Sequence, residues 1–140
     1  MAAFFPTTRA FKTVTHGNLS FEVPILYFRD DAFALFFTAD PGKVRSLMPS
    51  PRLHPVLLSA KKTMVGIAAF NYIETTIGPY GEVAVVLPAV YKASPPPALI
   101  PAILESRYPD FGALVMHLPV THILARDAGR EEWGYAKFVA

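Results

Sequence analysis

The chain has 140 residues, of which 52% are hydrophobic and 17% are charged, and its 13 basic and 11 acidic residues give a net charge of +2. This length predicts a single domain, residues 1–140, large enough to bury its own core. The lack of cysteine in the sequence excludes disulfides, thiolate metal sites and cysteine nucleophiles. The small net charge, with no basic run longer than two residues, gives no indication of nucleic-acid binding.

The apolar composition does not predict a membrane span. The longest uncharged run, residues 111–125, contains Pro119 and is shorter than the ~20 residues that a spanning helix needs. Pro6 and Arg9 lie where a signal peptide would have a continuous apolar segment. We therefore expect a cytoplasmic protein whose surplus apolar surface is buried in an interior cavity or in the interface of a homo-oligomer.

Short strands are predicted in the first third of the chain. Residues 1–20 show little pattern apart from an edge strand around Phe11–Val14. Two apolar runs, residues 24–28 and 32–38, predict strands that are joined by a polar turn at residues 29–31.

A short helix is predicted to follow these strands. Asp40 is a suitable N-cap and Pro41 suits the first helical position. The helix is expected to place Val44, Leu47 and Met48 on one face and to end before residue 49, which is a proline.

Apolar strands dominate the rest of the chain. Residues 64–73, 83–90 and 113–118 predict three strands, with a turn at Gly78-Pro79 between the first two. Two further short helices are predicted, one over residues 98–105 and one that Thr121 caps and that ends at Gly129. Many short strands, a few helices and frequent proline and glycine predict a β-rich α+β fold, with a mainly antiparallel sheet that curls or closes.

Two sequence blocks resemble the acetoacetate decarboxylase family. Residues 129–131 (Gly-Arg-Glu) and 134–137 (Gly-Tyr-Ala-Lys) are similar to the family's G-R-E and (G/A)-Y-P-K segment. Residues 72–74 and 78–82 are similar to its Y-x-E and G-P-Y-x-E elements. The resemblance spans the chain but covers only the N-terminal part of the family's usual domain, and it implies a cone-like β-barrel architecture.

The resemblance implies chemistry at Lys137. In the family, the matching lysine forms a Schiff base with a β-keto acid. This implies a decarboxylating lyase that needs no cofactor, has a small keto acid as its substrate and uses Lys137 as its nucleophile. A protonated amine cannot attack a carbonyl, and a water-poor pocket or a neighbouring positive charge favours the neutral form. Trp133, Tyr135 and Phe138 surround Lys137 in the sequence and can supply such a pocket.

The sequence departs from the family at two positions beside this lysine. Phe138 stands where many decarboxylases have a second lysine, and Ala136 stands where the family usually has proline. The first difference weakens charge repulsion as a means of activating the amine, so desolvation becomes the main candidate. The alternative interpretation of Lys137 is a solvated side chain close to a frayed terminus.

Five other residues complete the predicted site. The resemblance gives Glu74 the place of a carboxylate that assists catalysis by orienting the lysine or relaying a proton; otherwise it is a solvated carboxylate at a strand edge. Arg130 suits a substrate carboxylate, since guanidinium binds carboxylates in a bidentate manner, but it can equally pair with a nearby glutamate. Glu82 either binds substrate or pairs with an arginine. Arg29, close to the family's carboxylate-binding arginine, and Tyr135 are further candidates for substrate binding.

The expected substrate is small and largely hydrophobic, because Phe33, Phe70, Val85 and Met116 are expected to line the cavity. The four histidines lack the spacing of a metal site, so no metal is predicted. Two alternatives stay open. One is imine-dependent aldol or dehydration chemistry on a keto acid. The other is a non-catalytic or truncated family member that binds small molecules, in which unpaired strand edges need a second subunit to cover them.

Overall fold

The computed structural model describes residues 11–92 and 107–140. They form a β-rich α+β fold. The strands are β1 (Lys12–His16), β2 (Leu19–Val23), β3 (Tyr27–Ala39), β4 (Leu53–Pro55), β5 (Leu57–Ser59), β6 (Lys62–Thr75), β7 (Tyr80–Tyr91), β8 (Phe111–Val120) and β9 (Lys137–Val139), and the helices are α1 (Pro41–Leu47) and α3 (Ile123–Trp133). The helix expected over residues 98–105 lies outside the described residues.

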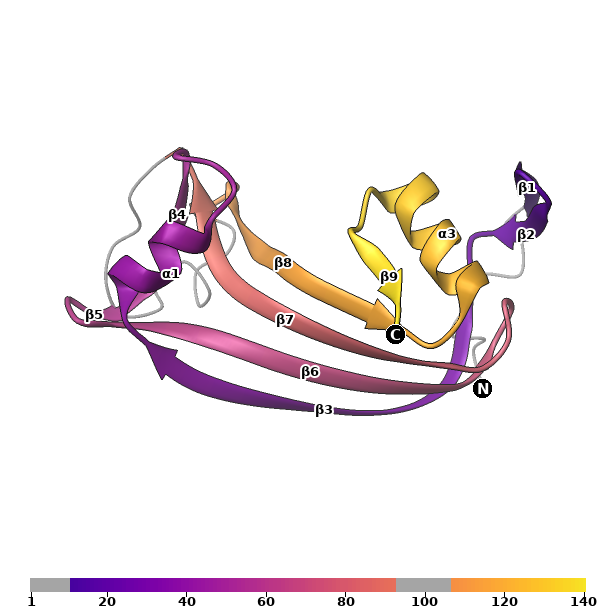
Figure 1. Cartoon of the computed structure of the whole chain (residues 1–140), viewed down its shortest axis with the longest axis horizontal. Coiled ribbons are helices and arrows are strands. Elements are labelled where there is room, and N and C mark those ends of the chain that lie inside the picture. Colours follow the sequence, from indigo (N-terminus) through magenta and orange to yellow (C-terminus); the bar gives the residue numbers. More distant parts are fainter. Residues whose placement is uncertain (1–10, 93–106) are drawn as a thin grey trace.

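The main sheet is open. Its strand order is β3-β6-β7-β8-β9, with β4 added to β7 and β5 added to β6, while β1 and β2 form a separate hairpin. Neighbouring strands are antiparallel except for β8 and β9, which are parallel. The long strands run side by side and bend along their length, so the sheet is curled (Figure 1). Within residues 11–92 and 107–140, β3 and β9 are the two outer strands and do not pair with each other.

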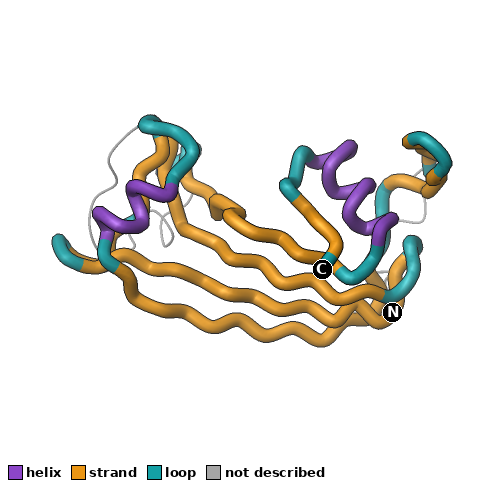
Figure 2. Tube along the Cα trace, viewed as in Figure 1, coloured by secondary structure: helices purple, strands orange, loops and turns teal. Residues whose placement is uncertain are grey.

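Within the described residues, each face of the sheet is covered by a helix at only one end. Successive side chains of a strand alternate between faces, so Tyr80 and Glu82 on β7 lie opposite to Leu87 and Ala89. We call the face that carries the Glu82 side chain the lysine face. Lys137 lies on this face too, because β8 pairs with both β7 and β9 and its register relates the two residues. The α1 face is the other one, where Leu87 and Ala89 pack in a cluster with residues of α1. Figure 2 shows α1 and α3 at opposite ends of the long strands.

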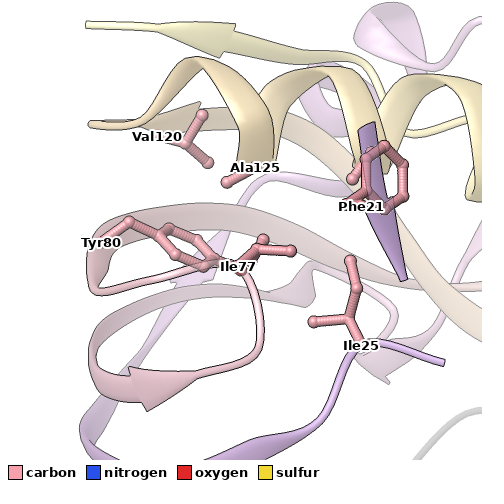
Figure 3. Close-up of a cluster of buried hydrophobic side chains, with 7 residues drawn as sticks. Phe21, Ile25, Ile77, Tyr80, Val120 and Ala125 are labelled. Carbon is pink, nitrogen blue, oxygen red and sulfur yellow. The ribbon is translucent and has the colours of Figure 1, made fainter. Parts of the chain in front are cut away.

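A second core lies beneath α3. Its buried members are Phe21, Ile25, Ile77, Tyr80, Val120, Ala125 and Ala128. Figure 3 shows how the β1–β2 hairpin, the turn before β7, the end of β8 and α3 each contribute to it. This core fixes α3, and with it the start of β9, against the lysine face.

The prediction of two strands joined by a turn at residues 29–31 is wrong. β3 runs without a break from Tyr27 to Ala39, with an irregularity in its pairing with β6 at Arg29. Three consecutive charged residues are compatible with this strand because it lies at the edge of the sheet, where both faces reach water. Polarity alone therefore does not mark a turn at this position.

The prediction of a helix capped by Asp40 is confirmed. Asp40 Oδ1 accepts a hydrogen bond of 2.9 Å from the Lys43 N–H, and Pro41 occupies the first turn of α1. Val44 and Met48 are buried against the sheet, as expected, but Leu47 is 67% exposed and does not belong to that buried face.

The predicted bounds of the last helix are wrong. The N-cap of α3 is His122, and the helix continues past Gly129 to a left-handed C-cap at Gly134, where φ is +67°. Thr121 does not cap the helix: its Oγ1 accepts a hydrogen bond of 2.8 Å from the Gly81 N–H. Gly129 and Gly134 both suit the end of a helix. The packing of Lys137 over Gly129, described below, explains why the helix does not end at Gly129. In the described parts of the chain, neither helix is long and apolar enough to cross a membrane.

Candidate active site

The structure buries Lys137 at the start of β9. The residue is 6% exposed, and its Nζ donates a hydrogen bond of 2.6 Å to Glu82 Oε2 on β7. Glu82 is also nearly inaccessible, with 10% of its side chain exposed. The ring of Tyr80 lies beneath the amine, with 5.6 Å between Nζ and the ring centroid. An amine, a carboxylate and an aromatic ring are thus held together away from bulk water.

Arg130 and Gly129 on α3 fix the position of this lysine. Arg130 Nε donates a hydrogen bond of 2.6 Å to the Lys137 main-chain oxygen. The Lys137 side chain passes directly over Gly129, where an added Cβ would lie 2.5 Å from Lys137 Cδ and 2.7 Å from Cε. Because a methyl group does not fit there, the absence of a side chain at Gly129 makes the channel through which the lysine reaches Glu82.

Three tyrosines form the floor beside the ion pair. The hydroxyl groups of Tyr27 and Tyr80 are 3.0 Å apart, and the ring of Tyr72 lies 4.8 Å from that of Tyr27 and 4.6 Å from that of Tyr80. Burial, more than any other cause, raises the pKa of Tyr27, Tyr72 and Tyr80 above the usual value, and the nearby Glu82 carboxylate adds to the rise for each. All three are therefore neutral at physiological pH and can donate hydrogen bonds.

We expect stability to fall as the pH rises above about 10, the ordinary pKa of tyrosine. The raised pKa values keep these three phenols protonated in the folded state, whereas the unfolded chain releases their protons near pH 10. The unfolded state then binds fewer protons, so rising pH favours unfolding. Ultraviolet absorbance of tyrosinate should show at least two of the six tyrosines, Tyr72 and Tyr80, ionising only as circular dichroism reports unfolding, while Tyr27 is 36% exposed and can ionise earlier. Ionisation of all six before unfolding would contradict the buried cluster.

Comparison with known proteins identifies the family and the fold of the chain. The sequence model of the acetoacetate decarboxylase family matches residues 13–140. The chain belongs to the acetoacetate decarboxylase family. In fold, it is similar to the crystal structure of acetoacetate decarboxylase from Legionella pneumophila subsp. pneumophila str. Philadelphia 1, with a TM-score of 0.60 and 20% sequence identity. The alignment covers 84% of this chain and 38% of the Legionella chain, so the chain spans well under half the length of that relative. No curated protein matches the chain.

The two glutamates that the family resemblance predicts as site residues lie at different places in the structure. Glu82 contacts the Lys137 amine, whereas Glu74 is exposed on β6 and lies directly across from Arg29 of β3 in the strand register. Arg29 is also exposed, and in the described part of the chain no ion pair joins either residue to Lys137. Of the two carboxylates, Glu82 is the one in position to exchange a proton with the amine.

The other two predicted residues lie close to Lys137 in the chain. Arg130 uses one guanidinium nitrogen to hold the Lys137 main chain, as described above. Tyr135 is 45% exposed, and its main-chain oxygen accepts a hydrogen bond of 2.8 Å from the Lys137 N–H. Both residues therefore shape the backbone from which the lysine projects.

The expected apolar cavity lining is wrong. Phe70 lies directly across from Glu82 and shares the lysine face, but Phe33 and Val85 lie on the other face by strand alternation. Val85 and Met116 line a separate pocket of about 290 Å³ beneath α1. The four residues cannot line one cavity, because they occupy both sides of the sheet.

A depression of about 340 Å³ lies behind the ion pair. Strand alternation places Ala69, Val83 and Pro119, which line it, on the face opposite to the Glu82 side chain, and Lys137 is not part of its lining. Its full lining is Ala69, Phe70, Gly81, Glu82, Val83, Pro119, Val120, Thr121 and Ala140. Residues 11–92 and 107–140 contain no group of three histidine, aspartate or glutamate side chains that could hold a metal ion.

Sequence reasoning missed Gly129 and Tyr80 as site residues. A glycine inside a helix is less favourable than alanine by about 1 kcal/mol, so an interior helical glycine signals a close approach. That signal was hidden because Gly129 also suits a helix end. Tyr80 belongs to the family-like block, but its place under the amine depends on the pairing of β7 with β8 and of β8 with β9.

Proposed function

We propose that this chain is a Schiff-base-forming lyase that decarboxylates a small β-keto acid, with Lys137 as the nucleophile. The observation that carries the proposal is the buried amine of Lys137, 2.6 Å from the equally buried Glu82 carboxylate. Membership of the acetoacetate decarboxylase family supports the substrate class.

Glu82 prepares the amine for attack. A protonated lysine beside a carboxylate is held in its charged form, so the proton has to leave before the nitrogen can react. The hydrogen bond between Nζ and Oε2 provides the path along which this proton passes to Glu82.

The imine then makes decarboxylation possible. The neutral amine attacks the ketone carbon of the β-keto acid, Glu82 gives its proton to the departing hydroxyl group, and water leaves, which gives a protonated imine. The bond between the carboxylate carbon and the α-carbon breaks, CO₂ departs, and the bonding electrons move to the imine nitrogen to form an enamine. Protonation at the α-carbon and hydrolysis release the ketone and restore Lys137. Glu82 gave up its proton when the imine formed, so the proton for the α-carbon comes from water, and the hydrolysis of the imine returns a proton to the pair of Lys137 and Glu82.

Borohydride trapping tests the proposal. The folded protein is incubated with acetoacetate, reduced with borohydride and digested, and each of its lysines is examined by peptide mass spectrometry. We expect a reduced adduct at Lys137, while Lys61 and Lys62, both exposed, serve as internal controls. Release of CO₂ is measured in parallel without reduction.

The outcomes separate the possible activities. An adduct at Lys137 with CO₂ release supports a decarboxylase. An adduct without CO₂ release supports aldol or dehydration chemistry through the same imine. Absence of the adduct, or adducts spread over exposed lysines at equal yield, contradicts the Schiff-base function and favours a member that only binds small molecules.

A further inference from the structure

Tyr72 presents a hydroxyl group beside the Lys137 amine. Its ring contacts the rings of Tyr27, Phe70 and Tyr80, with centroid distances of 4.8, 5.5 and 4.6 Å. The hydroxyls of Tyr27 and Tyr80 lie 3.0 Å apart and bond to each other, whereas no hydrogen bond joins the Tyr72 hydroxyl to another residue in the described part of the chain. Three ring contacts therefore fix a phenol whose hydroxyl the described fold does not use.

The strand order places Tyr72 where a bound substrate extends. The Lys137 side chain comes from β9, which pairs with β8, and its amine lies at Glu82 and over the Tyr80 ring, both on β7. On the α3 side, the same side chain packs over Gly129. The strand beyond β7 is β6, where Tyr72 lies directly across from Tyr80. A substrate that bonds to the nitrogen therefore extends over β6.

The charge of Glu82 decides which end of the substrate lies near Tyr72. One carbon atom separates the carboxylate of a β-keto acid from the ketone carbon that the amine attacks. Glu82 lies directly across from Phe70, one row away from Tyr72, and its charge repels a second carboxylate in this buried site. Asp30, across from Tyr72 on β3, is exposed, so water screens its charge. The substrate carboxylate is thus favoured beside Tyr72, and the apolar substituent beside Phe70.

A neutral donor suits a carboxylate that leaves as CO₂. Burial, and after it the Glu82 carboxylate, raises the pKa of Tyr72, so the hydroxyl keeps its proton. The substrate carboxylate loses its charge as the carbon–carbon bond breaks, and tight binding before that step does not accelerate it. A phenol orients the carboxylate with one hydrogen bond, whereas a guanidinium holds it with two charge-assisted bonds. Arg130 also has a different task, since its Nε holds the Lys137 main-chain oxygen.

We propose that the Tyr72 hydroxyl binds the carboxylate of the β-keto acid and directs it away from Glu82. The hydrogen bond holds the carbon–carbon bond that breaks in one orientation relative to the imine. Tyr72 keeps its proton throughout, so the decarboxylation step itself is unchanged. This inference rests on the proposed function for the identity of the substrate, and it adds a substrate-binding residue to the proposed site.

Trapping with two ketones tests the role of the hydroxyl. Tyr72→Phe keeps the ring and removes only the hydroxyl. It should raise the acetoacetate concentration for half-maximal borohydride trapping at Lys137 by about 10–100-fold, because a hydrogen bond to a charged group is lost. Trapping with acetone, which has the ketone but no carboxylate, should be unchanged. Tyr91→Phe is the matched control, since Tyr91 ends β7 on the α1 face, and it should change neither value.

Binding of 3-hydroxybutyrate tests the carboxylate site without imine chemistry. This molecule has the carboxylate but no ketone carbon for the amine to attack. Isothermal titration calorimetry should show that it binds the unmodified chain and that Tyr72→Phe weakens the binding by the same factor. Thermal melts followed by circular dichroism should give the same melting temperature for both proteins, because the removed hydroxyl has no partner in the described fold.

The results separate this inference from the Schiff-base function. Equal trapping of acetoacetate by Tyr72→Phe and the unmodified chain would overturn the inference and leave the function standing. Equal losses for acetone and acetoacetate, with a lower melting temperature, would overturn it too, because the hydroxyl would then support the fold. An untrapped chain that binds 3-hydroxybutyrate through Tyr72 would retain the carboxylate site and exclude the Schiff base. An untrapped chain without such binding would exclude both.

Discussion

Replacing Lys137 by methionine is expected to abolish the borohydride-trapped adduct and to lower the free energy of unfolding by about 3–5 kcal/mol. The adduct disappears because the nucleophile is gone. The loss of stability arises because Glu82, whose side chain is 10% exposed, is left as a buried charge without its partner. Globular domains are stable by only about 5–15 kcal/mol, so this variant will be substantially weakened. Urea denaturation followed by circular dichroism measures the change.

The double variant Lys137→Met/Glu82→Gln separates the chemical role from the structural one. Glutamine is neutral and similar in shape to glutamate, so the double variant should recover most of the stability that the single variant loses. It should still form no adduct. Glu82→Gln alone keeps the amine but removes the proton acceptor, and we expect adduct formation to slow by about 10²–10⁴-fold. Full stability in Lys137→Met would contradict the buried pair, and an adduct at another lysine of that variant, at the yield found for Lys137 in the unmodified chain, would contradict the catalytic assignment.

The pairing of Lys137 with Glu82 shows what could be predicted for the site. The family-like blocks contain Lys137, Glu74 and Glu82, so the residue types were predictable from the sequence. Which glutamate meets the lysine was not, because 55 residues separate Glu82 from Lys137 and their contact depends on two successive strand registers. A displacement of one residue in either register would turn one of the two side chains to the other face.

The fold was predictable where local chemistry and tertiary structure agree. The helix that begins at Asp40 has a cap, a proline and an apolar face, and all of these are local signals. The continuity of β3 was not predictable from residues 29–31, because charged residues suit an exposed edge strand as well as a turn. Its position at the edge of the sheet is a property of the whole topology.

The end of α3 was also not predictable from local signals in the sequence. Both Gly129 and Gly134 have the permissive backbone that a helix end requires. The structure uses Gly134 for the left-handed cap and places Gly129 in the helix interior, where the Lys137 side chain needs the space. Gly129, which the sequence suggests as the end of the helix, thus makes room for the Lys137 side chain. This role depends on the packing of β9 against α3, which local sequence does not indicate.

Gly129→Ala is therefore expected to disable the site with a much smaller effect on the fold. Alanine favours an interior helical position over glycine by about 0.5–1 kcal/mol, so without other contacts the change would stabilise α3. Here the added Cβ would lie 2.5 Å from Lys137 Cδ, and relieving such overpacking costs about 1–3 kcal/mol. The main chain of Lys137 is held by Arg130, so the flexible part of its side chain has to move, which carries the amine away from Glu82.

The readouts for this variant are the rate of adduct formation and the free energy of unfolding. A displacement of about 1 Å at a reacting group can reduce a rate by about 10²-fold, and we expect a loss of that order in trapping, with a net destabilisation of about 1–2 kcal/mol. Gly112→Ala is the matched control, because an added Cβ there meets no atom within 4 Å. It should leave the rate of adduct formation unchanged and raise the free energy of unfolding by no more than about 0.5–1 kcal/mol, the ordinary advantage of alanine over glycine in a strand. A Gly129→Ala variant that is more stable than the unmodified chain and traps substrate at the same rate would show that Lys137 does not depend on the space over α3.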